Sequence, residues 1–181
     1  MLGLKRGTVR LYPHEKAWEE EAARTIAVLK EILDDTAKDI QHVGSTSVLA
    51  IQAKPIIDIA VAVDSFDEIL AKEKELKNAG FYYRPDSSKT LKNQLLFACG
   101  SYYDGSGDLQ THFIHVVLTD SEDWVNYIHF RDYLNATPSA ACEYEQLKLQ
   151  LAEAAPIDSG RVQYTSGKHE FIQHILRQAK E

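Results

Sequence analysis

A glycine, a serine and an aspartate that could bind a phosphorylated ligand stand close together between positions 41 and 63. Gly44 and Ser45 follow a short extended run, and a glycine beside hydroxyl side chains lets backbone amides approach an anion. Asp58 is the one charge in the apolar run IIDIAVAV at 56–63, which is typical of a buried strand. A carboxylate buried there is costly unless it is paired, hydrogen-bonded or bound to a cation. The pattern predicts phosphate at the turn and Mg²⁺ on Asp58, an arrangement that nucleotidyl or phosphoryl transfer needs.

Three neighbouring residues could assist this site, and each also has an ordinary structural interpretation. Thr46 adds a hydroxyl to a turn that could hold an anion or could simply connect two elements. Lys54 could neutralise phosphate or could be a solvated lysine at the entry to the strand, and the two interpretations are about equally supported. His42 directly precedes the turn and could orient it by hydrogen bonding.

Two histidines, His112 and His115, stand three positions apart in a third apolar run. A regular strand directs side chains of odd separation to opposite faces, so only one of the two can face a given site. A two-histidine metal site is therefore the weaker hypothesis, and His112 stays a candidate ligand-binding residue only. His115 is expected to be a satisfied core histidine unless Asp58 lies across from it, in which case it could act as a metal ligand or a general base.

Composition indicates an ordinary globular protein. With 181 residues and 44% hydrophobic content, the chain can bury one sizeable core. Its net charge of −7 disfavours broad binding to nucleic acid. Because no apolar run approaches a membrane span and the N-terminus lacks the apolar core of a secretory signal, we expect no membrane contact and a cytoplasmic location. The oligomeric state is left open.

Periodicity predicts an α+β fold, with a mixed sheet flanked by helices and a helical C-terminal third. The predicted strands are residues 9–11, 40–43, 56–63, 81–84, 91–99 and 109–118. The predicted helices are residues 14–33, 48–53, 122–136, 138–154 and 165–179, and a further helix opens at the capping box of Ser65 and Glu68 and closes at 78–80. Residues 85–88 read as a turn-rich loop, and the glycine-rich stretch 100–107 as a hairpin loop or flap. We expect one domain over 1–181, in which 1–119 form the sheet-containing core and 120–181 a helical extension.

Four spaced motifs resemble successive signatures of the GrpB family. They are HVGSTSV at 42–48, AKPIIDI at 53–59, HFIHVV at 112–117 and FRDYL at 130–134. Segments around Tyr144 and from Tyr164 to Ile172 are similar to the C-terminal helices of that family. The resemblance covers nearly the whole chain in register, and such a series is more specific than any one motif.

The resemblance implies a nucleotidyltransferase-like fold, whose pattern is a Gly-Ser turn followed by a strand with two acidic residues at alternate positions. Gly44, Ser45 and Asp58 match this pattern. Ala60 stands where the second acid is expected, and alanine has no oxygen with which to hold a second magnesium ion. Fold-level analogy does not identify a substrate.

Two functions remain possible from the sequence, beside a less supported third possibility, a scaffold with no ligand. In the first, the chain transfers a nucleotidyl or phosphoryl group from a nucleotide or another phosphorylated small molecule, with Asp58 holding one magnesium and Lys54 and Arg131 balancing charge. In the second, it is a catalytically degenerate domain that binds a phosphorylated ligand without turnover. Ala60 favours the second function, whereas Asp58 in an apolar strand favours the first.

Overall fold

A five-stranded mixed sheet forms the centre of the molecule, with the order β2-β3-β7-β5-β4. The computed structural model describes residues 1–91 and 93–180, apart from the side chains of 88–90. The strands are β2 (Ala37–Val43), β3 (Ile57–Val63), β4 (Tyr82–Tyr83), β5 (Gln94–Cys99) and β7 (His112–Leu118). Only β3 and β7 pair in parallel; the other neighbours are antiparallel. The parallel register sets Ala60 beside His115.

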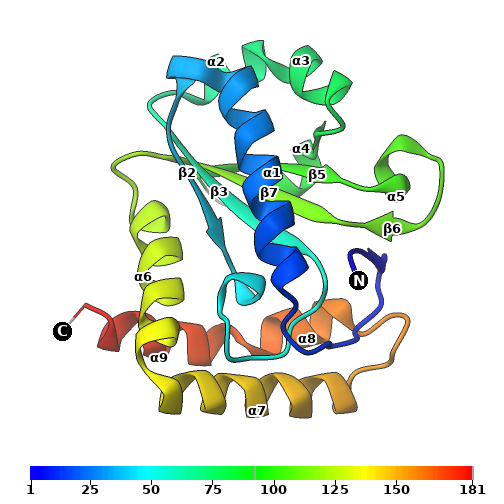
Figure 1. The fold of residues 1–181 in the computed structure, drawn as a ribbon, viewed down its shortest axis with the longest axis vertical. Helices are drawn as coiled ribbons and strands as arrows, with labels where there is room; N and C mark the ends of the chain where they lie inside the picture. Colours follow the sequence, from blue (N-terminus) through cyan, green and yellow to red (C-terminus); the bar gives the residue numbers. More distant parts are fainter. Residues whose placement is uncertain (92, 181) are drawn as a thin grey trace.

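Different helices cover the two faces of this sheet. Helix α1 (Lys16–Leu33) crosses one face, where Trp18 and Leu29 pack against Ile57 and Ile59 in the main core (Figure 1). Side chains alternate along a strand, so Asp58 and its same-face neighbours project to the other face. Helix α6 (Glu122–Ala136) contacts β2, β3 and β7. Because α6 leaves part of this second face uncovered, Asp58 remains accessible beside it, with 31% of its side chain exposed.

The C-terminal helices gather at one end of the sheet, while α2 (Phe66–Ala71) and α3 (Glu73–Asn78) lie at the other (Figure 1). The C-terminal helices at this end are α7 (Pro138–Ala154), α8 (Arg161–Gly167) and α9 (His169–Gln178). Val48 and Ile51, from the loop after β2, are buried among α6, α7 and α9 in a second apolar cluster. The helical part therefore packs on the segment that follows the Gly-Ser turn.

The N-terminal segment and the glycine-rich stretch meet in a small second sheet. Strand β1 (Leu4–Lys5) pairs with β6 (Leu109–Gln110), and a helical turn, α5 (Ser101–Asp104), precedes β6. The predicted edge strand at 9–11 is therefore wrong, and the single strand predicted at 109–118 is two strands. The two strands separate at Thr111, whose amide donates to the carbonyl of Cys99, and β6 joins β1 instead of the main sheet.

Several predicted boundaries also differ from the structure. Residues 48–53 form no helix, and the helical turn lies earlier, as the 3-10 turn η2 (Ser45–Ser47); another, η1 (Asp34–Thr36), follows α1. The predicted loop at 85–88 lies within the short helix α4 (Pro85–Thr90), which begins with proline where an unpaired amide would stand. Of the strand predicted at 91–99, residue 92 lies outside the described residues and β5 begins at Gln94.

Other helical predictions are confirmed or subdivided. Helices α6 and α7 have the predicted bounds, and the α+β class is confirmed. The helices predicted after Ser65 and over 165–179 are each two helices in the structure. Ser65 still caps α2, because its hydroxyl accepts a hydrogen bond from the Asp67 amide at 3.2 Å. Among the described residues, no helix combines the length and apolar character needed to cross a membrane.

Candidate functional site

The turn after β2 brings the backbone against the Asp58 carboxylate. Gly44 has φ +71°, and its carbonyl accepts a 2.6 Å hydrogen bond from the Ser47 hydroxyl. A Cβ atom built at Gly44 would lie 2.6 Å from Oδ2 of Asp58. Only glycine combines this backbone conformation with so close an approach. The turn and the carboxylate therefore form one structural unit.

Asp58 has the partner that its position in an apolar strand requires. Nε2 of His115 lies 3.2 Å from Oδ1 of Asp58, and His115 also packs against the Tyr127 ring at 5.2 Å. Nδ1 of His115 is buried and has no hydrogen-bond partner among the described residues. Since an ionised carboxylate only accepts, Nε2 donates to Asp58 and cannot accept a proton in the same arrangement. In this structure His115 thus orients Asp58 through Nε2, and a role as general base would fall to its other ring nitrogen, Nδ1, which is buried.

His112 lies on the opposite face of the sheet from His115. Its Nε2 is 3.1 Å from the Thr25 hydroxyl and 3.4 Å from a carboxylate oxygen of Glu21, both on α1. Burial lowers the pKa of His112, and the nearby carboxylates oppose that shift. The structure does not bring His112 together with Asp58, as strand alternation requires.

A cavity of about 230 Å³ opens beside the turn and Asp58. Asp58 is the one acid among the described residues that line it, and three cations, Lys54, Lys168 and Arg161, line it as well. Ser45 faces the same space. The local charge is therefore positive although the whole chain carries −7, which suits a polyanionic ligand.

Lys54 is held among other cations in this cavity. Its ammonium lies 4.9 Å from the centre of the Tyr164 ring, and that of Lys168 lies 4.8 Å from the same centre. Burial lowers the pKa of Lys54 from 10.5 to about 7, and the charges of Lys168 and Arg161 act in the same direction. A bound anion would offset this repulsion, so Lys54 suits anion binding better than a solvated role at the strand entry.

His42, Thr46 and Arg131 support the turn from behind and do not line the cavity. His42 Nε2 lies 2.9 Å from the Thr46 hydroxyl, and burial lowers the pKa of His42 to about 4, so the ring is neutral at pH 7. Arg131 donates from α6 to the Gln41 side chain at 2.9 Å and to the His42 carbonyl at 3.1 Å. These contacts fix the end of β2, which is where the turn begins.

The helical part also fixes the loop that follows the turn. The Asn135 side chain donates to the Ser47 carbonyl at 2.9 Å and accepts from the Leu49 amide at 3.1 Å. Further along, fully buried Lys148 donates to the Gln52 carbonyl. The Tyr144 hydroxyl lies 3.5 Å from that of Ser45. The position of Ser45 therefore depends on α6 and α7 as well as on the sheet.

Arg161 and Lys168 are the two cavity cations that are not among the site residues predicted from the sequence. They lie more than 100 positions after Ser45 in the chain, and α8 and the start of α9 bring them to the sheet. The available signal was the matched segment from Tyr164 onward, which contains Lys168.

The donor set limits any metal ion to one protein carboxylate. Within residues 1–91 and 93–180, no group of three or more histidine, cysteine or acidic residues could hold a metal ion. Ala60, one pleat along from Asp58, is 0% exposed. Mg²⁺ commonly takes one or two carboxylates and completes its shell with water and substrate phosphates, so Asp58 beside the open cavity fits one magnesium ion but not a pair.

Comparisons with known proteins identify the family. The family model described as GrpB protein matches residues 8–178. The chain belongs to the GrpB family. It is 38% identical over 179 residues to the glutamate-rich protein GrpB of Alkalihalophilus pseudofirmus, with 98% of this chain and 99% of that protein covered. The crystal structure of the conserved protein GrpB from Enterococcus faecalis matches with a TM-score of 0.79 and 29% identity, over 94% of this chain and 96% of that one.

A more distant likeness confirms the fold of this GrpB-family chain. The Cid1 poly(U) polymerase, in a structure bound to MgATP, matches with a TM-score of 0.50 and 18% identity, over 77% of this chain and 42% of that one. At this identity the likeness shows the fold alone. The expected nucleotidyltransferase-like fold is confirmed, and the site must be argued from its own residues.

Proposed function

We propose that this chain binds a nucleotide or another phosphorylated small molecule, together with a divalent metal ion, and transfers its nucleotidyl or phosphoryl group. Support comes above all from the cavity beside the Gly44 turn, where one carboxylate, Asp58, stands among the cations Lys54, Lys168 and Arg161. A polyphosphate would match these cations, and a metal ion between phosphate and carboxylate would match Asp58.

Each part of the cavity has a task in binding. The Ser45 hydroxyl and the backbone of the glycine turn would hold phosphate oxygens, as loops of this kind commonly do. Lys54, Lys168 and Arg161 would neutralise the remaining negative charge. When bound, magnesium would polarise the phosphoryl oxygens and reduce repulsion against an incoming nucleophile. His115 would keep Asp58 in position through the 3.2 Å hydrogen bond.

The proposed transfer exchanges one bond to phosphorus for another. A hydroxyl oxygen of an acceptor forms a bond to phosphorus, and the bond from that phosphorus to the leaving oxygen breaks. The leaving phosphate or pyrophosphate departs with the electron pair, and the hydroxyl proton passes to solvent or to the leaving group. The residues of the chain contribute positioning and charge stabilisation, which supply most of the catalysis in such reactions.

Binding without turnover is the second candidate function, and Ala60 favours it. Enzymes with two metals use paired carboxylates to stabilise both the attacking and the leaving oxygen. The buried alanine at this position leaves Asp58 alone. In that case the chain would recognise the phosphorylated ligand and release it unchanged.

Thermal unfolding with and without nucleotide tests both proposals. Mg²⁺ with each of the four nucleoside triphosphates should raise the melting temperature of the wild type for at least one of them, and Asp58→Asn should lose that gain. Asp64→Asn is the matched control, because Asp64 has 60% of its side chain exposed and lies outside the cavity lining. If no triphosphate stabilises the wild type, the proposed nucleotide site is wrong. With binding established, release of labelled pyrophosphate or phosphate separates transfer from binding alone.

A further inference from the structure

A second and larger cavity, of about 530 Å³, adjoins the one beside Asp58. The two share Phe113, Arg161 and Thr165 in their linings. A ligand in the larger cavity would therefore lie next to a ligand in the smaller one. The volume lies in the range that small-molecule sites occupy.

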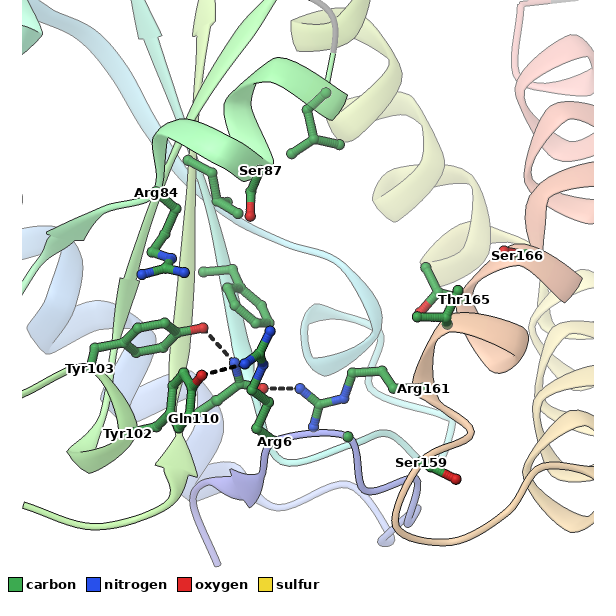
Figure 2. Close-up of a pocket in the computed structure, with 15 residues that line it drawn as sticks. Arg6, Arg84, Ser87, Tyr102, Tyr103, Gln110, Ser159, Arg161, Thr165 and Ser166 are labelled. Atoms are coloured by element: carbon green, nitrogen blue, oxygen red, sulfur yellow. Dashed lines mark hydrogen bonds between the residues drawn. The ribbon is translucent and has the colours of Figure 1, made fainter. Parts of the chain in front are cut away.

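Three arginines from different parts of the chain line this second cavity, which we call the arginine cavity. Arg6 follows β1, Arg84 precedes α4 and Arg161 begins α8, and Figure 2 shows their side chains directed into one space. None of the described residues that line it is an aspartate or a glutamate. In a chain with a net charge of −7, such a concentration of guanidinium groups needs a reason.

A buried glutamine holds two of the lining side chains in place. Gln110 is 5% exposed; its side-chain oxygen accepts from Arg161 and its nitrogen donates to the Tyr103 hydroxyl (Figure 2). Arg161 also donates to the carbonyls of Lys5 and Thr8, at 3.2 Å each. Because four hydrogen bonds already occupy its donors, Arg161 is fixed in position and would contribute mainly its positive charge to the binding of a ligand.

Two tyrosine rings orient the other arginines. The Arg6 guanidinium lies 5.0 Å from the centre of the Tyr102 ring, and that of Arg84 lies 5.2 Å from the centre of the Tyr103 ring. Burial raises the pKa of Tyr103, while the hydrogen bond from Gln110 and the charges of Arg84, Arg161 and Arg6 oppose the shift. Guanidinium groups held in this way recognise phosphate through paired N–H donors.

The geometry points to a site in the arginine cavity for the phosphate group of a second, small phosphorylated substrate. This inference rests on the proposed function, because the shared wall would place the hydroxyl of that substrate beside the cavity in which the transferred group is held. The second substrate would be the acceptor in the proposed transfer. Its phosphate, which does not react, would bind the arginines and position the hydroxyl.

Binding of two probe compounds tests the arginine cavity. Glycerol 3-phosphate and fructose 1,6-bisphosphate should bind the wild type, as measured by calorimetry at low salt, even when a non-hydrolysable ATP analogue and Mg²⁺ are saturating. Arg6→Gln with Arg84→Gln should weaken that binding at least about tenfold, because two charge-assisted partners are lost. Arg177→Gln is the control, since Arg177 is exposed and lies outside both cavities. Circular dichroism verifies that each variant is folded.

The outcomes separate this inference from the proposed function. If the nucleotide analogue binds but neither phosphate compound does, or if the double variant binds them as the wild type does, the inference is wrong and the proposed function stands. If the phosphate compounds bind and the double variant loses them while no nucleotide binds, the arginine cavity is an anion site and the proposed function fails. Tighter binding of oligo(U) than of either compound, lost in the double variant, would overturn the small-molecule assignment in favour of RNA.

Discussion

At the scale of single residues, the cost of burying charge explains the positions of Asp58 and Lys54. Asp58 lies in an apolar strand and is stabilised by a donor from His115 and by partial exposure. Lys54 is placed among other cations, which is unfavourable in the absence of a ligand. An arrangement that costs stability in the free protein is common where a ligand supplies the missing charge.

Replacing Lys54 by methionine should stabilise the free protein. The pKa of Lys54 falls from 10.5 to about 7 on folding. Below about pH 7 the lysine is charged in both states, and the folded state bears the full cost of burying it. Between those two pKa values the folded state releases the proton and the unfolded state keeps it, so wild-type stability rises with pH. Lys54→Met should therefore melt higher than the wild type at pH 7, by an amount that shrinks towards pH 10.

The control for Lys54→Met is Lys74→Met, because Lys74 is exposed on α3. The same Lys54→Met protein should lose stabilisation by nucleotide. A variant that melts below the wild type at pH 7 and still binds nucleotide would contradict the role assigned to this lysine.

Replacing Ala60 by aspartate tests the face of β3 that carries Asp58. The new carboxylate would enter a site that is 0% exposed, one pleat from Asp58, so we expect a loss of about 3 kcal/mol or more in chelator. Magnesium should restore part of the lost stability if both carboxylates reach the cavity, and nucleotide should stabilise the variant further. Urea unfolding with EDTA and with Mg²⁺ measures this. An equal loss of stability with EDTA and with Mg²⁺ would mean that the face of β3 around Ala60 is packed core only.

At the scale of elements, the loop after the turn is held by helices from the other end of the chain. Asn135→Ala removes a donor to the Ser47 carbonyl and an acceptor for the Leu49 amide. Because Asn135 is exposed, we expect a loss of only about 1 kcal/mol in the free energy of unfolding. Affinity for nucleotide should fall more than this loss of stability suggests, since Ser45 lies at the start of the same loop. Asn78→Ala, at the end of α3, is the control. Equal nucleotide affinity in the two variants would show that the contacts of α6 do not position the turn for binding.

The sequence could predict elements whose signals are local, and failed where distant segments decide. Helix α6 begins at its Ser121 cap and α7 begins with Pro138, so both were predictable. The separation of β6 from β7 depends on pairing with β1, more than 100 positions away. Similarly, the turn and Asp58 were visible as neighbouring motifs, whereas Arg161 reaches the cavity only through tertiary packing. A charged residue in a distant helix, such as Arg161 on α8, leaves no pattern in the sequence around Gly44 or Asp58 that would predict its presence in the cavity.

At the scale of the whole molecule, the sheet and the helical part share apolar contacts and should unfold together. Val9, near the N-terminus, packs with Ala155 and Tyr164, and Ile51 lies among the C-terminal helices. In Trp124→Phe protein, tryptophan fluorescence reports only Trp18, which lies on α1 and is buried against the sheet. The urea midpoint of the fluorescence transition should coincide with the midpoint measured by far-UV circular dichroism, to which all helices contribute. Separate midpoints would show that residues 120–181 unfold as an independent unit.

The parallel pairing of β3 with β7 also sets the order in which the site can form. Asp58 and His115 are 57 positions apart, and Arg161 contacts the Lys5 carbonyl across 156 positions. Such long loops close late, after local helices and hairpins have formed. Synthesis proceeds from the N-terminus, so the carboxylate and the glycine turn leave the ribosome long before Arg161 and Lys168. A growing chain therefore has no complete cavity, and competence to bind a polyanion arises only after α8 and the start of α9 have been synthesised.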